Sequence, residues 1–506
     1  MRAAVLDLGS NSFHVLVADL DGASVAPVLR EREMLHLGRA VARHGQVPDE
    51  QAQAAVDTVA HLAELARRAG ARTVQAVATA ALRDASNGQQ VLDRLRDVAG
   101  TPIRVLDGLE EARLAYLGVR ASVAVDAEPI LVLDLGGGSL ELAVGVGDQV
   151  SWSVSTPLGA SRLSADVSDD PPGPQDLAWL REQVDAQIDP VVDLVRAHAP
   201  ATCVAVGGTV RALARLAAAG HARWLPATVN QLTLPTTELA ALRDRLTGVD
   251  LTRRHKVPGM KSRRADHVHV AAAVLTRTLE RLAVREVTVS DWGLREGLLL
   301  DAAGSFQPPV ATALRAGEVA RLRRSLRADT DPHSDHVADL AGQLFDGTLA
   351  LHGLGSRDRG LLVLAARLHA IGGALALRRQ HVHGAYLVEN AELRGFSPTD
   401  VAILSTLVRF HPSRGISASF PAFASLAFLD RQRTEALLPL LQVADGLDRA
   451  HDQAVTRVHV SHDHDRVKLW LDGGGLHVTA AELARRTRLF EEVYAVEVLV
   501  EDRAVV

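Results

Sequence analysis

Three glycine-rich turns beside apolar strands are the residues whose types and spacing first suggest chemistry. Glycine lets backbone N–H groups approach a ligand without a Cβ atom in the way, and such turns bind phosphate groups. A single turn of this kind is more often an ordinary strand end, so the prediction of a phosphate site depends on all three together. The turns are Gly9-Ser10-Asn11-Ser12, Gly136-Gly137-Gly138-Ser139 and Gly207-Gly208-Thr209.

Acidic residues stand beside two of these turns. Asp7 and Asp134 each end the strand before a turn, and Glu141 lies on the strand that follows the second turn. Carboxylate oxygens are ligands that Mg²⁺ prefers, and in a strand–turn–strand unit Asp134 and Glu141 can converge on one ion. We therefore predict a magnesium site at Asp134 and Glu141, with Asp7 as a further candidate ligand.

Two more acids, Glu110 and Glu111, begin a predicted helix just after the strand that ends near Leu106. The macrodipole favours negative side chains in the first turn of a helix, which would make this pair structural. A position near the boundary between two lobes also suits a catalytic acid or base. The residues alone leave both interpretations open.

The elements that position these residues occur twice. Residues 3–8 and 13–19 are predicted strands on either side of the first turn, and residues 129–134 and 140–146 repeat the pattern around the second. Two similar halves in tandem predict an α/β fold of two related lobes that face each other across a cleft.

The rest of the chain has a different character. From about residue 310 to residue 450 the sequence reads as consecutive helices, and alternation typical of strands returns after residue 455. A length of 506 residues also exceeds what one hydrophobic core supports. The predicted domains are a first lobe (1–120), a second lobe (121–304), a helical domain (305–450) and a small α+β end domain (451–506).

Composition excludes several classes of protein. The net charge of −6 produces no basic field for DNA, and no apolar run approaches the ~18 residues of a membrane span. Asp7 interrupts the early apolar stretch, so no signal peptide is expected. Cys203, the single cysteine, cannot form an internal disulfide, which favours a reducing, cytoplasmic location. The chain also lacks a Gly-x-x-x-x-Gly-Lys-Ser/Thr phosphate loop.

Five blocks in order along the first 300 residues together resemble the exopolyphosphatase/guanosine pentaphosphate phosphohydrolase (Ppx/GppA) family. This family belongs to the actin/sugar-kinase/Hsp70 superfamily, and the later part of the chain resembles its long form. The blocks are Asp7-Leu8-Gly9-Ser10-Asn11-Ser12-Phe13-His14, Ala78-Thr79-Ala80-Ala81-Leu82-Arg83-Asp84-Ala85, Gly108-Leu109-Glu110-Glu111-Ala112-Arg113, Asp134-Leu135-Gly136-Gly137-Gly138-Ser139-Leu140-Glu141 and Ser290-Asp291-Trp292-Gly293-Leu294-Arg295-Glu296-Gly297.

The resemblance implies a role for each matching residue. Glu111 corresponds to the family's catalytic base, Asp134 and Glu141 to its Mg²⁺ ligands, and Arg83 with the three glycine turns to its phosphate contacts. The implied enzyme is a Mg²⁺-dependent phosphoric anhydride hydrolase that releases terminal phosphate from inorganic polyphosphate. The long family members also imply a homodimer.

Other functions stay open at this point. The family also removes the 5′ γ-phosphate of guanosine pentaphosphate (pppGpp), although the few aromatic residues (3%) mildly favour polyphosphate over a nucleotide. A sensor of polyphosphate or alarmone without turnover is a second alternative, which the retained acids disfavour. A sugar kinase shares the fold but not the blocks at residues 78–85 and 108–113. The basic run at residues 253–264 is either a track for a polyanion or a solvated loop.

The helical region resembles a degenerate HD-type metal phosphohydrolase domain. His333-Ser334-Asp335-His336, Leu368-His369-Ala370 and Ala444-Asp445 correspond to its three stations, but Ala370 stands where the HD aspartate would lie. Losing that carboxylate removes both a ligand and a charge. The sequence therefore predicts an inherited scaffold without a metal ion of its own.

Overall fold

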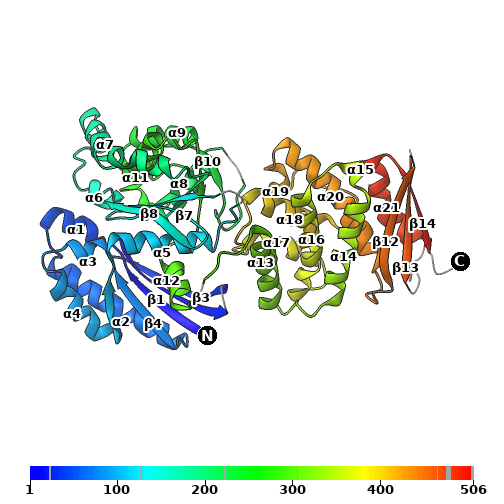
Figure 1. The fold of residues 1–506 in the computed structure, drawn as a ribbon, viewed down its shortest axis with the longest axis horizontal. Coiled ribbons are helices and arrows are strands. Elements are labelled where there is room, and N and C mark those ends of the chain that lie inside the picture. Colours follow the sequence, from blue (N-terminus) through cyan, green and yellow to red (C-terminus); the bar gives the residue numbers. More distant parts are fainter. Residues whose placement is uncertain are drawn as a thin grey trace. The chain divides into compact units, whose positions relative to one another are not determined.

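The computed structural model describes residues 1–21, 24–125, 128–221, 224–304, 306–463, 465–473 and 480–502 (Figure 1). The chain divides into two compact units. The first unit comprises residues 1–222 and 229–311, and the second comprises residues 223–228 and 312–506. The finer division into four domains stays a prediction.

The first sheet is built around a central β1 strand. Its order is β3-β2-β1-β4-β5, in which β1 pairs antiparallel with β2 and parallel with β4. The β1–β2 register places Asp7 opposite His14, on either side of the 9–12 turn. The strands are β1 (Arg2–Leu8), β2 (Ser12–Asp21), β3 (Ser24–Met34), β4 (Thr73–Ala78) and β5 (Ile103–Val105).

The second sheet repeats this arrangement. Its order is β10-β11-β9-β6-β7-β8, in which β6 pairs antiparallel with β7 and parallel with β9, and Asp134 lies opposite Glu141. The shared strand order confirms the predicted duplication into two actin-like lobes. The strands are β6 (Ile130–Leu135), β7 (Leu140–Val146), β8 (Gln149–Thr156), β9 (Thr202–Val206), β10 (Thr233–Pro235) and β11 (Glu286–Val289).

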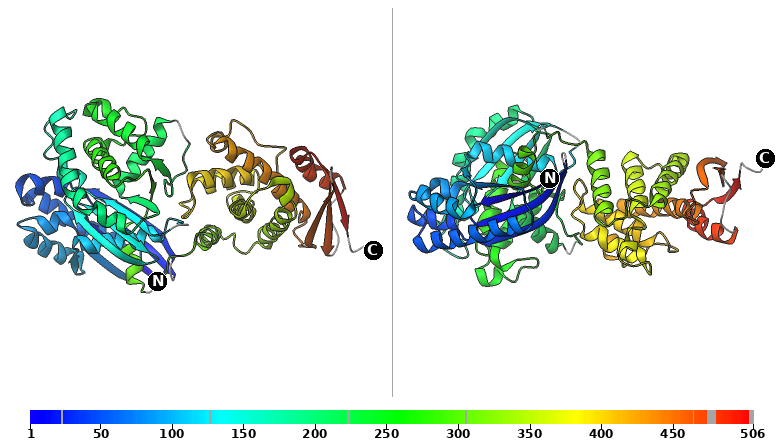
Figure 2. Two further views of the ribbon diagram at one scale, coloured as in Figure 1. Left: turned by 45° about the horizontal axis from the view of Figure 1, so that its top comes forward. Right: turned by 90° about the horizontal axis from the view of Figure 1, so that it is seen from below.

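Helices cover both faces of the first sheet. Successive side chains of a strand point to opposite faces, and in this sheet both faces are apolar. Ala4, Leu6 and Leu8 of β1 pack with α2 (Asp49–Arg68) and α4 (Gly88–Ala99). Ala3 and Val5 face the other way, into a core that contains α5 (Gly108–Arg120), α12 (Leu294–Ala302) and strands of the second sheet. Figure 1 shows α5 between β8 of the second sheet and β1 of the first, and Figure 2 gives two further views of this unit. These two helices therefore join the lobes.

The remaining helices of the first unit surround the two sheets. Among them α11 packs against both α7 and α9 on the second lobe. The helices are α1 (Leu37–His44), α3 (Ala80–Asp84), α6 (Ala160–Leu163), α7 (Pro174–Ala197), α8 (Gly208–Gly220), α9 (Thr236–Thr247), α10 (Leu251–Arg254), the 3₁₀ turn Ser262–Arg264 and α11 (Val268–Arg281).

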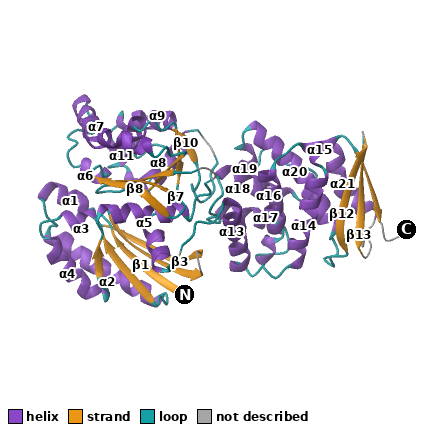
Figure 3. Cartoon of the chain, in the orientation of Figure 1, coloured by secondary structure: helices purple, strands orange, loops and turns teal. Residues whose placement is uncertain are grey.

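The second unit combines a helical bundle with a three-stranded sheet (Figure 3). Val455, Leu469 and Phe490 of the C-terminal elements belong to the same apolar core as the helices, so the end piece packs as part of the bundle. The elements are α13 (Ala311–Ser325), α14 (Pro332–Gly347), α15 (Leu349–His352), α16 (Ser356–Leu368), the 3₁₀ turn Ile371–Ala374, α17 (Gln380–Asn390), α18 (Pro398–Phe410), α19 (Pro421–Ala424), α20 (Phe428–Leu447), β12 (Val455–Asp463), β13 (Arg466–Gly473), α21 (Ala480–Tyr494) and β14 (Glu497–Asp502). Across the described residues, no helix combines the length and apolarity that a membrane span requires.

The helices α5 and α12 approach so closely that glycine is needed where they touch. A Cβ atom on Gly297 would lie 1.8 Å from the carbonyl oxygen of Leu114, and one on Gly118 would lie 2.1 Å from that of Gly293. Gly118 and Gly297 thus serve the packing of these two helices.

This contact predicts that Gly297→Ala destabilises the protein, although alanine is the better helix former. Overpacking should cost about 1–3 kcal/mol or more of unfolding free energy, because the backbone of α5 must move. The same added methyl group at Gly317 of α13 meets nothing within 4 Å, so Gly317→Ala should stabilise by about 0.5–1 kcal/mol. Urea unfolding of both full-length variants measures this. Equal effects of the two changes would contradict the packing argument.

Candidate active site

A pocket lies where the carboxyl ends of the central strands of the two lobes meet. Every predicted site residue except Arg83 lines it, as do several residues that the sequence analysis did not single out for the site. These additional residues include His14, Arg32, Thr79, Arg211, Asp291, Gly293, Arg264, Arg295 and Glu296.

The 9–12 turn of the first lobe touches the 136–139 turn of the second. A Cβ atom on Gly138 would lie 2.6 Å from Ser10 Oγ and 2.8 Å from the Cβ atom of Ala80. Across the same junction, Ser161 Oγ donates a hydrogen bond of 2.6 Å to Asn11 Oδ1. Gly138 is therefore required by the close approach of Ser10 and Ala80 of the first lobe, whatever ligand the turn binds.

The third turn begins a helix. Gly207 adopts φ +117°, a conformation that favours glycine, and α8 starts at the next residue. The first backbone N–H groups of a helix have no partner within it and carry its positive dipole end. Because Gly208 and Thr209 line the pocket, this helix N-terminus offers a binding site for an anion.

Burial raises the pKa of four of the carboxyl groups that line the pocket, those of Asp7, Glu111, Asp134 and Glu141. The pKa of Asp7 and that of Asp134 rise to about 6. Glu141, only 4% exposed, has a pKa raised well above its usual value, with repulsion from Glu111 and Asp134 adding to burial. Ser155 Oγ donates to Glu141 Oε1 at 2.8 Å and holds it in place.

This carboxyl cluster fits Mg²⁺. Asp134 and Glu141 lie opposite each other on β6 and β7, and oxygen donors are what this hard cation prefers. A divalent cation would offset the repulsion and burial that raise their pKa values. The predicted metal ligands are thus brought together.

Glu111 stands at the start of α5, where Asp107 caps the helix by accepting a hydrogen bond of 2.8 Å from the backbone N–H of Glu110. Burial raises the pKa of Glu111 to about 7, and the adjacent Arg83 guanidinium opposes that rise. Arg83 Nη1 donates to Glu111 Oε1 at 2.5 Å and to the Leu106 carbonyl at 2.8 Å. Arg83 is therefore placed against Glu111, outside the lining residues, and its phosphate contact stays a prediction.

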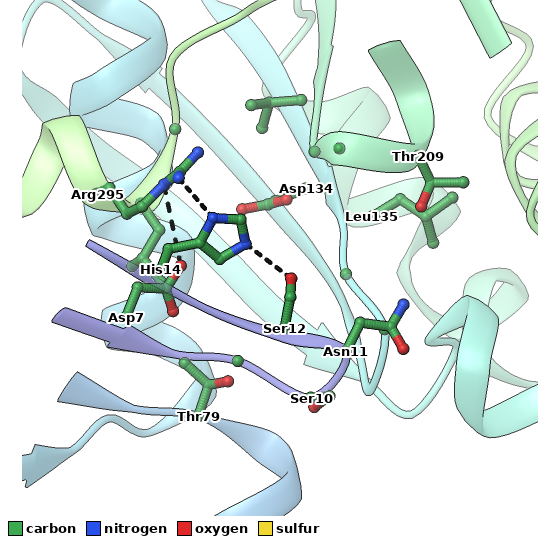
Figure 4. A pocket seen from close by; sticks show the side chains of 18 of the residues that line it. Asp7, Ser10, Asn11, Ser12, His14, Thr79, Asp134, Leu135, Thr209 and Arg295 are labelled. Atoms are coloured by element: carbon green, nitrogen blue, oxygen red, sulfur yellow. Dashed lines mark hydrogen bonds and ion pairs between the residues drawn. The ribbon is translucent and has the colours of Figure 1, made fainter. Parts of the chain in front are cut away.

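A chain of contacts links the first lobe to α12 (Figure 4). Arg295 lies 4.0 Å from Asp7 and donates to His14 Nδ1 at 2.9 Å, while His14 Nε2 lies 2.7 Å from Ser12 Oγ. Burial and then the positive charge of Arg295 hold the pKa of His14 well below its usual value. Neutral His14 therefore carries its proton on Nε2 and donates it to Ser12. This leaves the Ser12 hydroxyl proton to donate elsewhere.

The basic run at residues 253–264 is divided between two roles. Arg254 is fully buried and binds Asp170 and the carbonyls of Leu246 and Ala265, so it stabilises the fold. Arg264 lines the pocket and donates to Thr209 Oγ1 at 3.2 Å. The side chain of Arg263 lies outside the described residues.

Arg211 and Arg295 add positive charge to the same pocket as Arg264. Arg211 follows Thr209 on α8, and Arg295 begins α12 directly after the Gly293 turn. The sequence reasoning missed these arginines. Both lie within the first four residues of a helix that begins at or directly after a glycine, and this position was the signal that could have identified them.

The duplicated actin-like fold has one pocket that combines a carboxyl cluster, a helix N-terminus and arginines. This combination is typical of proteins that bind phosphate groups. The profile of the Ppx/GppA phosphatase family matches residues 16–306, and that of Ppx/GppA phosphatase, domain III, matches residues 314–485. This chain belongs to the Ppx/GppA phosphatase family, which confirms the resemblance seen in the sequence blocks.

Individual relatives agree with this assignment. Exopolyphosphatase 1 of Mycobacterium tuberculosis (strain ATCC 25618 / H37Rv) is 36% identical over 304 residues, which cover 59% of this chain and 88% of the relative. The protein of the same name from Mycobacterium leprae is also 36% identical and is 89% covered, against 59% of this chain. A crystal structure of an exopolyphosphatase from Cytophaga hutchinsonii matches with a TM-score of 0.56 and 27% identity, covering 60% of this chain and 100% of that one.

The raised pKa values predict an unusual dependence of stability on pH. A carboxyl group with a higher pKa in the folded chain than in the unfolded chain stabilises the fold at low pH, and this stability is lost as pH rises through the folded pKa. For Asp134 the window runs from about 4, the unfolded value, to about 6. In EDTA, Asp134→Asn should therefore be more stable than the wild type at pH 8, on the order of 1–3 kcal/mol, and nearly equal to it at pH 4.

Urea unfolding at the two pH values measures this difference. Asp193→Asn is the matched control, because the Asp193 side chain is 92% exposed and pairs with Arg196 one turn away on the same helix. A lower unfolding free energy for Asp134→Asn than for the wild type at pH 8 would contradict the raised pKa of Asp134.

Proposed function

We propose that this protein is an exopolyphosphatase, which hydrolyses the terminal phosphate of inorganic polyphosphate with Mg²⁺. The names of its relatives support this substrate class. The observation that carries the proposal is a buried Glu111, with a pKa near 7, in the same pocket as Asp134, Glu141 and the N-terminus of α8.

Glu111 serves as the base. A general base is most effective when its pKa lies near the working pH, and the value of about 7 meets that condition. Arg83 opposes the rise that burial causes and so keeps part of the Glu111 population deprotonated at neutral pH. Glu111 accepts a proton from water as the water oxygen bonds to the terminal phosphorus. The P–O bond to the rest of the chain breaks, which releases orthophosphate and a shorter polyphosphate.

The other lining residues hold the phosphate groups. The backbone N–H groups that begin α8, the Thr209 hydroxyl and the 136–139 turn bind oxygens of the terminal phosphate, and Ser12 donates its hydroxyl proton to the same group. Arg211, Arg264 and Arg295 offset the charge of the phosphates that follow in the chain. Asp134 and Glu141, with Asp7, would hold Mg²⁺, which when bound supplies positive charge to the oxygen that leaves.

The proposal predicts that Glu111→Gln lowers turnover on the order of 10²–10⁴-fold, the usual contribution of a general base. Phosphate release is to be measured in parallel on long polyphosphate, short polyphosphate and pppGpp. Glu110→Gln is the control, because Glu110 is the adjacent acid and pairs with Arg104 at 2.6 Å. It should retain turnover within a few-fold. Faster release from pppGpp than from both polyphosphates would favour the nucleotide activity instead.

Metal dependence is tested separately. EDTA should abolish phosphate release and Mg²⁺ should restore it, because the predicted ligands are all carboxylates. Glu141→Gln should raise the Mg²⁺ concentration for half activation by about tenfold or more, because one anionic ligand is lost. Recovery with Zn²⁺ alone, or an unchanged Mg²⁺ requirement in the variant, would be inconsistent with this site.

A homodimer and a cytoplasmic location stay predictions from the family resemblance.

A further inference from the structure

Three buried side chains from separate parts of the helical bundle converge in the second unit. His333 lies in α14, His369 directly after α16, and Asp445 in α20, and they are between 1% and 3% exposed. His333 Nε2 lies 3.2 Å from His369 Nε2, and each of these atoms lies 3.5 Å from Asp445 Oδ1. Among the described residues this is the cluster whose ligand atoms all lie close enough to share a metal ion.

The second nitrogen of each imidazole determines where its proton sits. His369 Nδ1 lies 2.6 Å from the carbonyl oxygen of Ala366, which can only accept, so Nδ1 carries the hydrogen. His333 Nδ1 lies 2.8 Å from Asp448 Oδ2, a carboxylate that also accepts. When both rings are neutral, their Nε2 atoms therefore direct lone pairs toward each other and toward the Asp445 carboxylate. Three such acceptors converge stably only around a positive charge.

The size of the triangle indicates which cation fits. Ligand bonds of about 2.0–2.2 Å to a tetrahedral zinc ion give ligand–ligand distances of about 3.3–3.6 Å. The three observed distances are 3.2, 3.5 and 3.5 Å. A proton shared between His333 and His369 would account for only the first of these distances and would not place Asp445 at equal distance from both rings.

We propose that the helical bundle holds one divalent transition-metal ion of the zinc class through His333 Nε2, His369 Nε2 and Asp445 Oδ1. Imidazole nitrogens select such metals over Mg²⁺, so this site is distinct from the carboxyl cluster of the first unit. Three protein ligands leave the fourth tetrahedral position to water or an anion, as in zinc sites that do chemistry.

The groups around the cluster orient its ligand atoms, as the outer groups of protein metal sites do. Asp448 and the Ala366 carbonyl orient the two imidazoles, and Arg486 Nη1 pairs with Asp445 Oδ2 at 3.0 Å, which directs Oδ1 to the cluster. The exposed ring of His451 stacks on His333 at 3.7 Å between ring centroids, so the cluster lies close beneath the surface on that side. Loss of the HD aspartate at Ala370 predicted no metal, but the three remaining groups are sufficient.

Metal uptake by the full-length protein tests this site without reference to phosphate release. After EDTA treatment and its removal, the protein is loaded with Zn²⁺, gel-filtered and analysed for zinc. A parallel sample receives Co²⁺, whose visible absorption is strong in a tetrahedral site and weak in an octahedral one. The wild type should retain one equivalent of zinc more than His369→Gln, and only the wild type should show the strong cobalt absorption.

Two further variants complete the experiment. Asp445→Asn keeps the size of the side chain and should weaken zinc binding at least tenfold, which covers the case in which His369→Gln fails to fold. His462→Ala removes an exposed histidine of β12 and should retain wild-type uptake. Circular dichroism confirms folding of each variant. Equal zinc content in the wild type and a folded His369→Gln or Asp445→Asn, or no strong cobalt absorption in the wild type, would overturn the proposal.

Discussion

The contact between the two glycine turns is the constraint on which the rest of the first unit depends. With Gly138 against Ser10, the ends of β1 and β6 come together from separate sheets. Asp7 and Asp134, which end those strands, are thereby buried in one pocket where they repel each other. A larger side chain at the contact would separate the turns and relieve the repulsion. The polar site depends on Gly138, which has no side chain to hold Ser10 and Ala80 of the first lobe away.

The two helices that join the lobes carry opposite charges into that pocket. Glu111 comes from the first turn of α5 and Arg295 from the first turn of α12, and these helices touch backbone to backbone at Gly118 and Gly297. The positions of a candidate base and of an anion-binding cation are therefore set by one packing interface. A change that spreads α5 from α12 would alter the chemistry as well as the stability, because these two helices carry Glu111 and Arg295 into the pocket.

The two polar clusters of the chain follow different physical rules. In the first unit, like-charged carboxyl groups are buried together and their pKa values rise. In the second unit, nitrogen lone pairs of His333 and His369 meet a carboxylate whose other oxygen is paired with Arg486. Oxygen donors suit Mg²⁺ and imidazole donors suit zinc-like metals. The two proposals thus assign different kinds of metal ion to the two units, because the ligand atoms of the two clusters differ.

The sequence by itself determined the duplicated lobes, the three turns and the acids at strand ends, because strand alternation and glycine positions are local signals. The alternation of serine with Val150, Trp152 and Val154 is a further local signal, which indicates the strand β8. Only the tertiary structure decided that Arg83 meets Glu111 and that His333, His369 and Asp445 converge. Those contacts join residues from 28 (Arg83 and Glu111) to 112 (His333 and Asp445) positions apart, so their distances depend on how helices and sheets pack. Periodicity along the chain carries no information on such distances.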